Sequence, residues 1–258
     1  MKIFPLGTSR IHEPLKFSHD RSLMSFPGIG FFHSPSQILD ILEFIYGSKK
    51  IDIELARFFF RKDGTKENPF DRSVWDDQES LDAVMEKIKR LYFSSDSLII
   101  EISSLRSFSF RNCSVQGNPN YYRNIPYSEI WKLNYYHLYH SELDVAEKQD
   151  DEALEPLIKK LLKIQKDENK SILIVGHLID PQNPNKTRLQ LNSQLENAVK
   201  TYGETSIKYY DARELVSRYG FRVLTDTKVD IAHIPLTALE EQARIMEELL
   251  NTAIADEV

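Results

Sequence analysis

The sequence alternates between short apolar runs and stretches with helical periodicity. Residues 97–103 (SLIIEIS) and 171–175 (SILIV) have the length and composition of strands that are buried on both faces. Other stretches, such as residues 78–91, repeat apolar side chains at intervals of three and four. Parallel strands need long crossover connections, which are usually helices. The alternation therefore predicts an α/β fold of the three-layer α/β/α kind, with a mostly parallel central sheet.

Signals at the ends of segments set the expected boundaries. A first strand is expected over residues 2–6 and a second, irregular one over 22–32. Ser34 followed by Pro35 is typical of a helix start, and Gly47 of a helix end. Further helices are expected over residues 78–91, 127–146, 152–166, 189–202, 212–219 and 236–254, and further strands over 97–103, 171–175 and 206–210. Residues 1–258 are predicted to form a single domain with insertions at 48–77 and 105–150, the latter including a loop or hairpin at 108–117.

Composition narrows the classes of function. The 33 Lys and Arg residues against 39 Asp and Glu residues give a net charge of -6, which disfavours nucleic acid as a partner. A lone cysteine, Cys113, excludes an internal disulfide and a cysteine-rich zinc site, and we expect an inert thiol. No window approaches the roughly 20 apolar residues that span a bilayer. We therefore expect a cytoplasmic protein with no membrane partner and no cofactor; its oligomeric state is left open.

Two short motifs lie where a parallel sheet binds its ligands, beyond the carboxyl ends of its strands. Ser9 lies in the turn that follows the first expected strand. Asp230 and His233 lie three residues apart just before the last helix. A carboxylate beside an imidazole can fix the tautomer of the ring, and such a ring can activate a serine hydroxyl. If the chain brings these segments together, the three residues form a nucleophile, a base and an orienting acid.

Each of these residues also has a plainer interpretation. Ser9 could cap the first helix, which is a common role for serine. Asp230 could cap a turn, and His233 could be a hydrogen-bonded, partly buried histidine. Taken singly, each plainer interpretation is favoured over the functional one. Taken jointly, they must explain why both motifs lie at matching strand ends.

The G-x-S turn after the first strand and the D-x-x-H-x-P before the final helix resemble those of the SGNH (GDSL-type) hydrolase superfamily. The expected order of elements is similar along nearly the whole chain, although the motifs themselves are short. The resemblance implies an SGNH/flavodoxin-like fold, with Ser9 as nucleophile, His233 as general base and Asp230 as its partner. It also implies oxyanion donors from Ser9, from a glycine (Gly28 or Gly30) and from an asparagine after the third strand.

The asparagine of the SGNH pattern has no counterpart in this sequence. The strand runs into Glu101-Ile102-Ser103-Ser104 instead of Gly-x-Asn. Ser103 or Ser104 could donate in its place, and losing one oxyanion donor typically costs about 10²–10³ in turnover. Glu101 is unusual in a buried strand; we expect it to pair with Arg10 or Arg106, or to belong to the pocket.

Other polar residues lie at the same edge of the expected sheet. Arg10 could hold an anionic group of the substrate, or could pair with a carboxylate such as Glu13. His33 is a candidate for substrate contact, His177 could line the pocket, and His12 is more often an incidental residue. His137 and His140 share a helical face, but no third ligand has a diagnostic spacing, so no metal is expected.

The leading hypothesis is a serine esterase or acyltransferase acting on an O-acyl group. The motifs do not distinguish hydrolysis from transfer, and the resemblance implies a small-molecule or glycan substrate such as an acetylated carbohydrate. The alternative is a binding or accessory protein that keeps the fold without turnover. A nucleotide-binding domain ranks last, because neither G-x-G-x-x-G nor a P-loop motif occurs.

Overall fold

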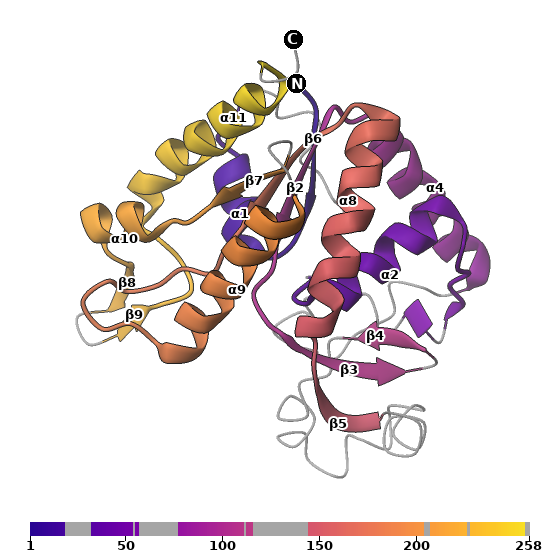
Figure 1. Ribbon diagram of the computed structural model, residues 1–258, viewed down its shortest axis with the longest axis horizontal. Helices are drawn as coiled ribbons and strands as arrows, with labels where there is room; N and C mark the ends of the chain where they lie inside the picture. Colours follow the sequence, from indigo (N-terminus) through magenta and orange to yellow (C-terminus); the bar gives the residue numbers. More distant parts are fainter. Residues whose placement is uncertain are drawn as a thin grey trace.

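Four parallel strands form the centre of the molecule (Figure 1). The computed structural model describes residues 1–18, 32–53, 55–56, 77–110, 112–115, 144–203, 207–225 and 228–255. The sheet order is β1-β2-β6-β7, with every neighbouring pair parallel. These strands are β1 (Ile3–Leu6), β2 (Ser97–Glu101), β6 (Ser171–Val175) and β7 (Ile207–Tyr210). The prediction of a mostly parallel sheet is confirmed.

The strands end at one common edge. Leu6 pairs with Ile100, Glu101 with Val175, and Val175 with Tyr210. The residues that directly follow β1 and β6 therefore meet at this edge, as the alternation of strands and helices predicts.

Helices cover both faces of the sheet. One face packs against α2 (Pro35–Tyr46), α4 (Gln78–Phe93), α8 (Leu154–Glu168) and α9 (Lys186–Tyr202). The other packs against α1 (Ser9–Leu15), α10 (Arg213–Tyr219) and α11 (Leu239–Ala255). Successive residues of β2 alternate between the two layers: Leu98 and Ile100 face the first group, and Ile99 faces the second. The three-layer α/β/α class is confirmed.

The ends of α2 follow directly from the sequence. The Ser34 hydroxyl accepts a hydrogen bond from the Gln37 N–H, and Pro35 occupies the first helical position. Gly47 adopts a left-handed conformation with φ of 76° and closes the helix, as expected from a residue without a Cβ.

A second, smaller sheet lies within residues 105–150. It has the order β4-β3-β5, from β3 (Arg106–Phe110), β4 (Cys113–Val115) and β5 (Asp144–Gln149). Strands β3 and β4 form an antiparallel hairpin, which confirms the hairpin option at this place. The predicted helix over 127–146 is wrong at its end, because residues 144–146 belong to β5, a strand that pairs with β3. Ladder pairing there overrides the local helical preference of the residues.

The segment before the last helix forms a short hairpin and a single tight helical turn. Strands β8 (Arg222–Thr225) and β9 (Lys228–Asp230) pair antiparallel. The 3₁₀ turn η3 (Leu236–Ala238) precedes α11, and another, η2 (Asp151–Ala153), precedes α8. Within the described ranges, no helix is long and apolar enough to cross a membrane.

Some predictions fall on residues that are not described. They include most of the second strand over 22–32, with Gly28 and Gly30, and most of the insertion over 48–77. The helical interpretation of 127–143, which contains His137 and His140, also lies outside the described residues. The single domain over 1–258 stays a prediction.

The burial of both sheet faces can be tested on one strand. Ile99 and Ile100 are fully buried on opposite faces of β2. Ile99→Ala and Ile100→Ala should each lower the free energy of unfolding by roughly 2–5 kcal/mol, measured by urea denaturation. Leu224→Ala, at a side chain that is 50% exposed, is the control and should change stability by less than about 0.5 kcal/mol. A near-neutral effect at either isoleucine would contradict the three-layer packing.

Candidate active site

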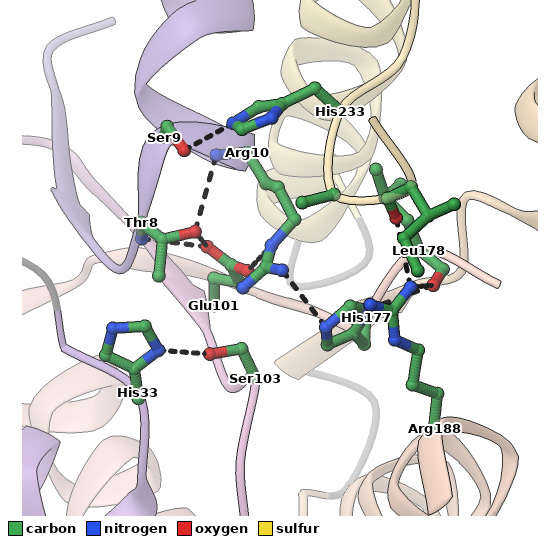
Figure 2. Close-up of polar contacts among 12 residues, drawn as sticks. Thr8, Ser9, Arg10, His33, Glu101, Ser103, His177, Leu178, Arg188 and His233 are labelled. Atoms are coloured by element: carbon green, nitrogen blue, oxygen red, sulfur yellow. Dashed lines mark hydrogen bonds and ion pairs between the residues drawn. The ribbon is translucent and has the colours of Figure 1, made fainter. Parts of the chain in front are cut away.

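Ser9 stands at the carboxyl edge of the sheet, two residues after the Gly7 turn that ends β1. It is the first residue of α1, and the residue that caps this helix is Thr8, whose hydroxyl accepts a hydrogen bond from the Arg10 N–H. The helix-cap interpretation of Ser9 is therefore wrong. The Ser9 hydroxyl lies 2.6 Å from Nε2 of His233, as Figure 2 shows.

Asp230 completes a line of three side chains. Its Oδ2 lies 2.7 Å from Nδ1 of His233, and its Oδ1 accepts a hydrogen bond of 3.0 Å from the Ala232 N–H. Burial opposes ionisation, but the Ala232 and His233 hydrogen bonds outweigh it and hold the pKa of Asp230 below its usual value. An ionised Asp230 accepts a hydrogen bond from Nδ1–H of His233, which leaves Nε2 without a hydrogen and able to accept a hydrogen bond from the Ser9 hydroxyl.

Two arginines hold the loop that carries His233. Arg188, on α9, donates from Nη1 to the Ile231 carbonyl at 3.0 Å and to the Leu178 carbonyl at 3.3 Å. The Arg222 N–H donates to the His233 carbonyl at 2.9 Å, and the Arg222 guanidinium pairs with Glu13 on α1. Neither arginine was predicted from the sequence, because no local pattern marks a side chain that reaches across the fold.

Buried apolar side chains border the Ser9–His233 pair. Leu178, Ile234 and Leu239 are buried and line a small pocket together with Ser9 and His233. A surrounding of low polarity strengthens the hydrogen bond between the hydroxyl and the ring.

Glu101 is fully buried directly beneath the Ser9 turn. Its Oε2 accepts hydrogen bonds from the Thr8 N–H at 2.8 Å and the Thr8 hydroxyl at 2.5 Å, and its Oε1 pairs with Nε of Arg10. Burial alone would raise the pKa of Glu101, but the Arg10 charge and the Thr8 hydrogen bonds reverse the direction and lower it. Of the two arginines considered as partners for Glu101, the structure selects Arg10. Glu13, the alternative partner of Arg10, pairs with Arg222 instead.

Gly7 permits this close approach. A Cβ at Gly7 would lie 2.6 Å from Cβ of Glu101 and 2.8 Å from Cδ1 of Ile11. Any larger residue would displace the carboxylate or the turn, so glycine is needed here to bring the backbone close to Glu101.

His177 follows β6 at the same edge and is 7% exposed. Its Nε2 lies 3.0 Å from Nη1 of Arg10, and its Nδ1 lies 2.9 Å from the Leu178 carbonyl. The Asn192 side chain fixes its backbone, accepting from the His177 N–H at 2.8 Å and donating to the His177 carbonyl at 2.9 Å. Burial, followed by the charges of Arg10 and Arg188, lowers the pKa of His177 to about 3. The ring is therefore neutral, with the proton on Nδ1.

His33 and Ser103 form a separate pair. His33 Nδ1 lies 2.8 Å from the Ser103 hydroxyl, and Figure 2 shows this pair below Thr8 and apart from His233. The N–H groups of Ser103 and Ser104 both donate to the His33 carbonyl at 2.9 Å. Those two N–H groups are thus occupied. The Ser103 hydroxyl is bonded to His33 as well, and it keeps its own hydrogen for a substrate where Nδ1 of His33 is the donor. In the part of the chain that the structure describes, no three His, Cys, Asp or Glu side chains gather as a metal site would require.

The neutral state of His177 makes stability depend on pH. In the unfolded chain the ring takes up a proton near pH 6.5, whereas in the folded protein it does so only near pH 3. Its contribution is therefore complete above pH 6.5 and is lost as the pH falls through this interval. His177→Gln should reduce the slope of unfolding free energy against pH by up to roughly 1 kcal/mol per pH unit, measured by urea denaturation between about pH 5 and 7. Equal slopes in both proteins would contradict the neutral ring.

Comparison with known proteins identifies a family for the first half of the chain. The family described as the TviD N-terminal domain matches residues 1–130, a range that contains Ser9 and Glu101 but not Asp230 or His233. No SGNH family matches, and neither the curated proteins nor the solved structures gave a match. Since the match covers half of the 258 residues, the chain belongs to the TviD N-terminal domain family.

Proposed function

We propose that this protein is a serine-dependent acyltransferase or esterase of the SGNH type, acting on an O-acyl group of a carbohydrate. One observation carries the proposal: the hydrogen-bonded line from the Ser9 hydroxyl through the His233 ring to the Asp230 carboxylate. This is the arrangement in which a serine can lose its proton while it attacks a carbonyl carbon.

The reaction would proceed in two matched halves. His233 Nε2 takes the Ser9 proton as Oγ bonds to the acyl carbon of the donor. The tetrahedral adduct collapses, the bond to the donor oxygen breaks, and the departing alcohol takes the proton from His233. A second hydroxyl, from a sugar or from water, then gives its proton to His233 as it attacks the acyl-serine. The bond between the acyl carbon and Ser9 Oγ breaks, and Oγ takes the proton back from His233. Asp230 stays ionised throughout and stabilises the imidazolium.

Stabilisation of the oxyanion would come partly from the Ser9 turn. The Thr8 N–H is bonded to Glu101 and the Arg10 N–H to the Thr8 hydroxyl. The Ser9 N–H is the donor of this turn that remains for a developing oxyanion. The Ser103 hydroxyl is our candidate for the donor that replaces the asparagine of the SGNH pattern, since it lies at the same strand end.

The family context favours transfer over hydrolysis. The TviD name is that of a Vi-antigen acetyltransferase-related protein, and Vi is a capsule polysaccharide. Acyl transfer to or from a sugar hydroxyl is compatible with this context. Both outcomes use the same three residues, so the acceptor decides between them.

A binding protein without turnover is the second candidate. It is favoured by the position of Glu101. The Glu101 carboxylate, paired with Arg10, lies at the strand end where the SGNH pattern has Gly-x-Asn. A variant that removes only the nucleophile separates the two candidates.

Ser9→Ala is that variant. It should abolish both covalent labelling by a fluorophosphonate probe and turnover of p-nitrophenyl acetate, while circular dichroism and melting temperature stay close to those of the wild type. Mass spectrometry of the labelled wild type should place the adduct on Ser9. Absence of any adduct on the wild-type protein, or equal turnover by Ser9→Ala, would refute the proposed nucleophile.

Asp230→Asn tests the orienting role of the carboxylate. An amide can donate to Nδ1 and so stabilise the wrong tautomer; the corresponding change in a serine protease lowers turnover by about 10⁴. We expect the labelling rate to fall by roughly 10²–10⁴ with the fold intact. A rate within about twofold of the wild type would show that Asp230 is a structural residue only.

A further inference from the structure

We propose that Glu101 and Arg10 are positioning residues that fix the Ser9 turn for attack, so that Arg10 does not bind substrate. The inference rests on the proposed function of Ser9 and adds two residues to its machinery. It concerns a buried ion pair that does not itself touch the Ser9 hydroxyl.

Both chain neighbours of Ser9 are anchored to the same carboxylate. Thr8 donates to Oε2 through its N–H and its hydroxyl, and Arg10 donates to Oε1 through Nε. Ser9 is therefore held from both sides by Glu101, which is 0% exposed and belongs to β2. Because the backbone is fixed on both sides of Ser9, the Ser9 hydroxyl is held within hydrogen-bonding distance of His233.

The chemistry of this anchor requires a carboxylate. An ionised carboxylate only accepts hydrogen bonds, so both of its oxygens can receive donors. A glutamine of the same shape would turn one oxygen into an NH₂ group that faces either Thr8 or Arg10, which also donate. One side of the anchor would then be lost, and a buried donor would lack an acceptor.

The anchor is continuous with the rest of the sheet edge. Arg10 Nη1 donates to Nε2 of His177, and His177 Nδ1 donates to the Leu178 carbonyl. Arg188 donates to the same carbonyl and to that of Ile231, two residues before His233. The contacts that hold the nucleophile and those that hold the base therefore converge on one backbone oxygen, as Figure 2 shows.

Two of the three guanidinium nitrogens of Arg10 are used within the protein. Nε is bonded to Glu101 and Nη1 to His177, and the Arg10 side chain is 10% exposed. Loss of the anchor should therefore slow the reaction of Ser9 without weakening the binding of a small ligand.

The test compares two variants of the anchor with a matched buried carboxylate elsewhere. Glu101→Gln removes the charge with little change of shape. Arg10→Lys keeps the charge but has one ammonium nitrogen in place of Nε and Nη1, which bond to Glu101 and His177. Asp40→Asn is the control, because Asp40 on α2 is also buried, pairs with Lys49 and accepts from the Ser114 N–H at 2.6 Å. For each protein, the fluorophosphonate reaction is resolved into KI and the maximal rate kinact, well below the melting temperature.

We expect kinact to fall by roughly 10- to 100-fold in Glu101→Gln and Arg10→Lys, with KI within about twofold of the wild type. Asp40→Asn should label like the wild type even where it lowers the melting temperature. If Glu101→Gln or Arg10→Lys is folded and its kinact equals that of the wild type, the inference is overturned. A raised KI with unchanged kinact would also overturn it, by making Arg10 a substrate-binding residue.

Hydrogen–deuterium exchange distinguishes a failure of the proposed anchor from a failure of the proposed function of Ser9. If the wild type itself is not labelled, the proposed function fails, and exchange of the amides in residues 5–12 decides the inference alone. Faster exchange there in Glu101→Gln than in Asp40→Asn, with α8 unchanged, would support the anchor. Equal exchange in the two variants would overturn it.

Discussion

The hydrogen bond between the Ser9 hydroxyl and His233 joins residues 224 positions apart, and it depends on how the parallel sheet orders the chain. Strand β1 lies at one end of the sheet and is followed by α1, while α11 packs on α1 and on β6. Ile11 and Leu15 of α1 share a buried cluster with Met246 and Leu250 of α11. Burial of apolar surface between these helices therefore places α1, which begins at Ser9, beside α11, which follows His233 (Figure 1).

Polar contacts then convert this proximity into a defined geometry. Glu101 and Arg10 fix the turn that carries Ser9, and Arg188 and Arg222 fix the loop that carries His233. At this edge Glu101 pairs with Arg10, Arg222 pairs with Glu13, and Arg188 donates to two carbonyls. Such partners are the condition under which burial of charge is tolerated. The same edge thus combines an apolar layer behind Ser9 with a network of charges beneath it.

The sequence predicted the parts of the fold that local physics dictates. The strand SILIV and the helix opened by Ser34-Pro35 and closed by Gly47 were predicted with the bounds observed, because burial periodicity and capping act within a few residues. The meeting of Ser9, Asp230 and His233 also followed from motif position. Strand β5 was mistaken for helix, since pairing with β3 is a property of distant residues. Arg188 and Arg222 escaped notice for the same reason: their acceptors lie on other elements. The choice of Arg10 over Arg106 for Glu101 needed the register of β1 against β2.

The most direct test of the central claim is nitrogen NMR of the His233 ring, with resonances assigned by comparison with His233→Gln. We expect Nδ1 of the ring to carry the hydrogen that faces Asp230. The Nε2 signal should move on Ser9→Ala, and the strong hydrogen bond of the Nδ1 proton should be lost on Asp230→Asn. An Nε2 signal that ignores the loss of the Ser9 hydroxyl would show that the two side chains do not meet, and the proposed chemistry would have no basis.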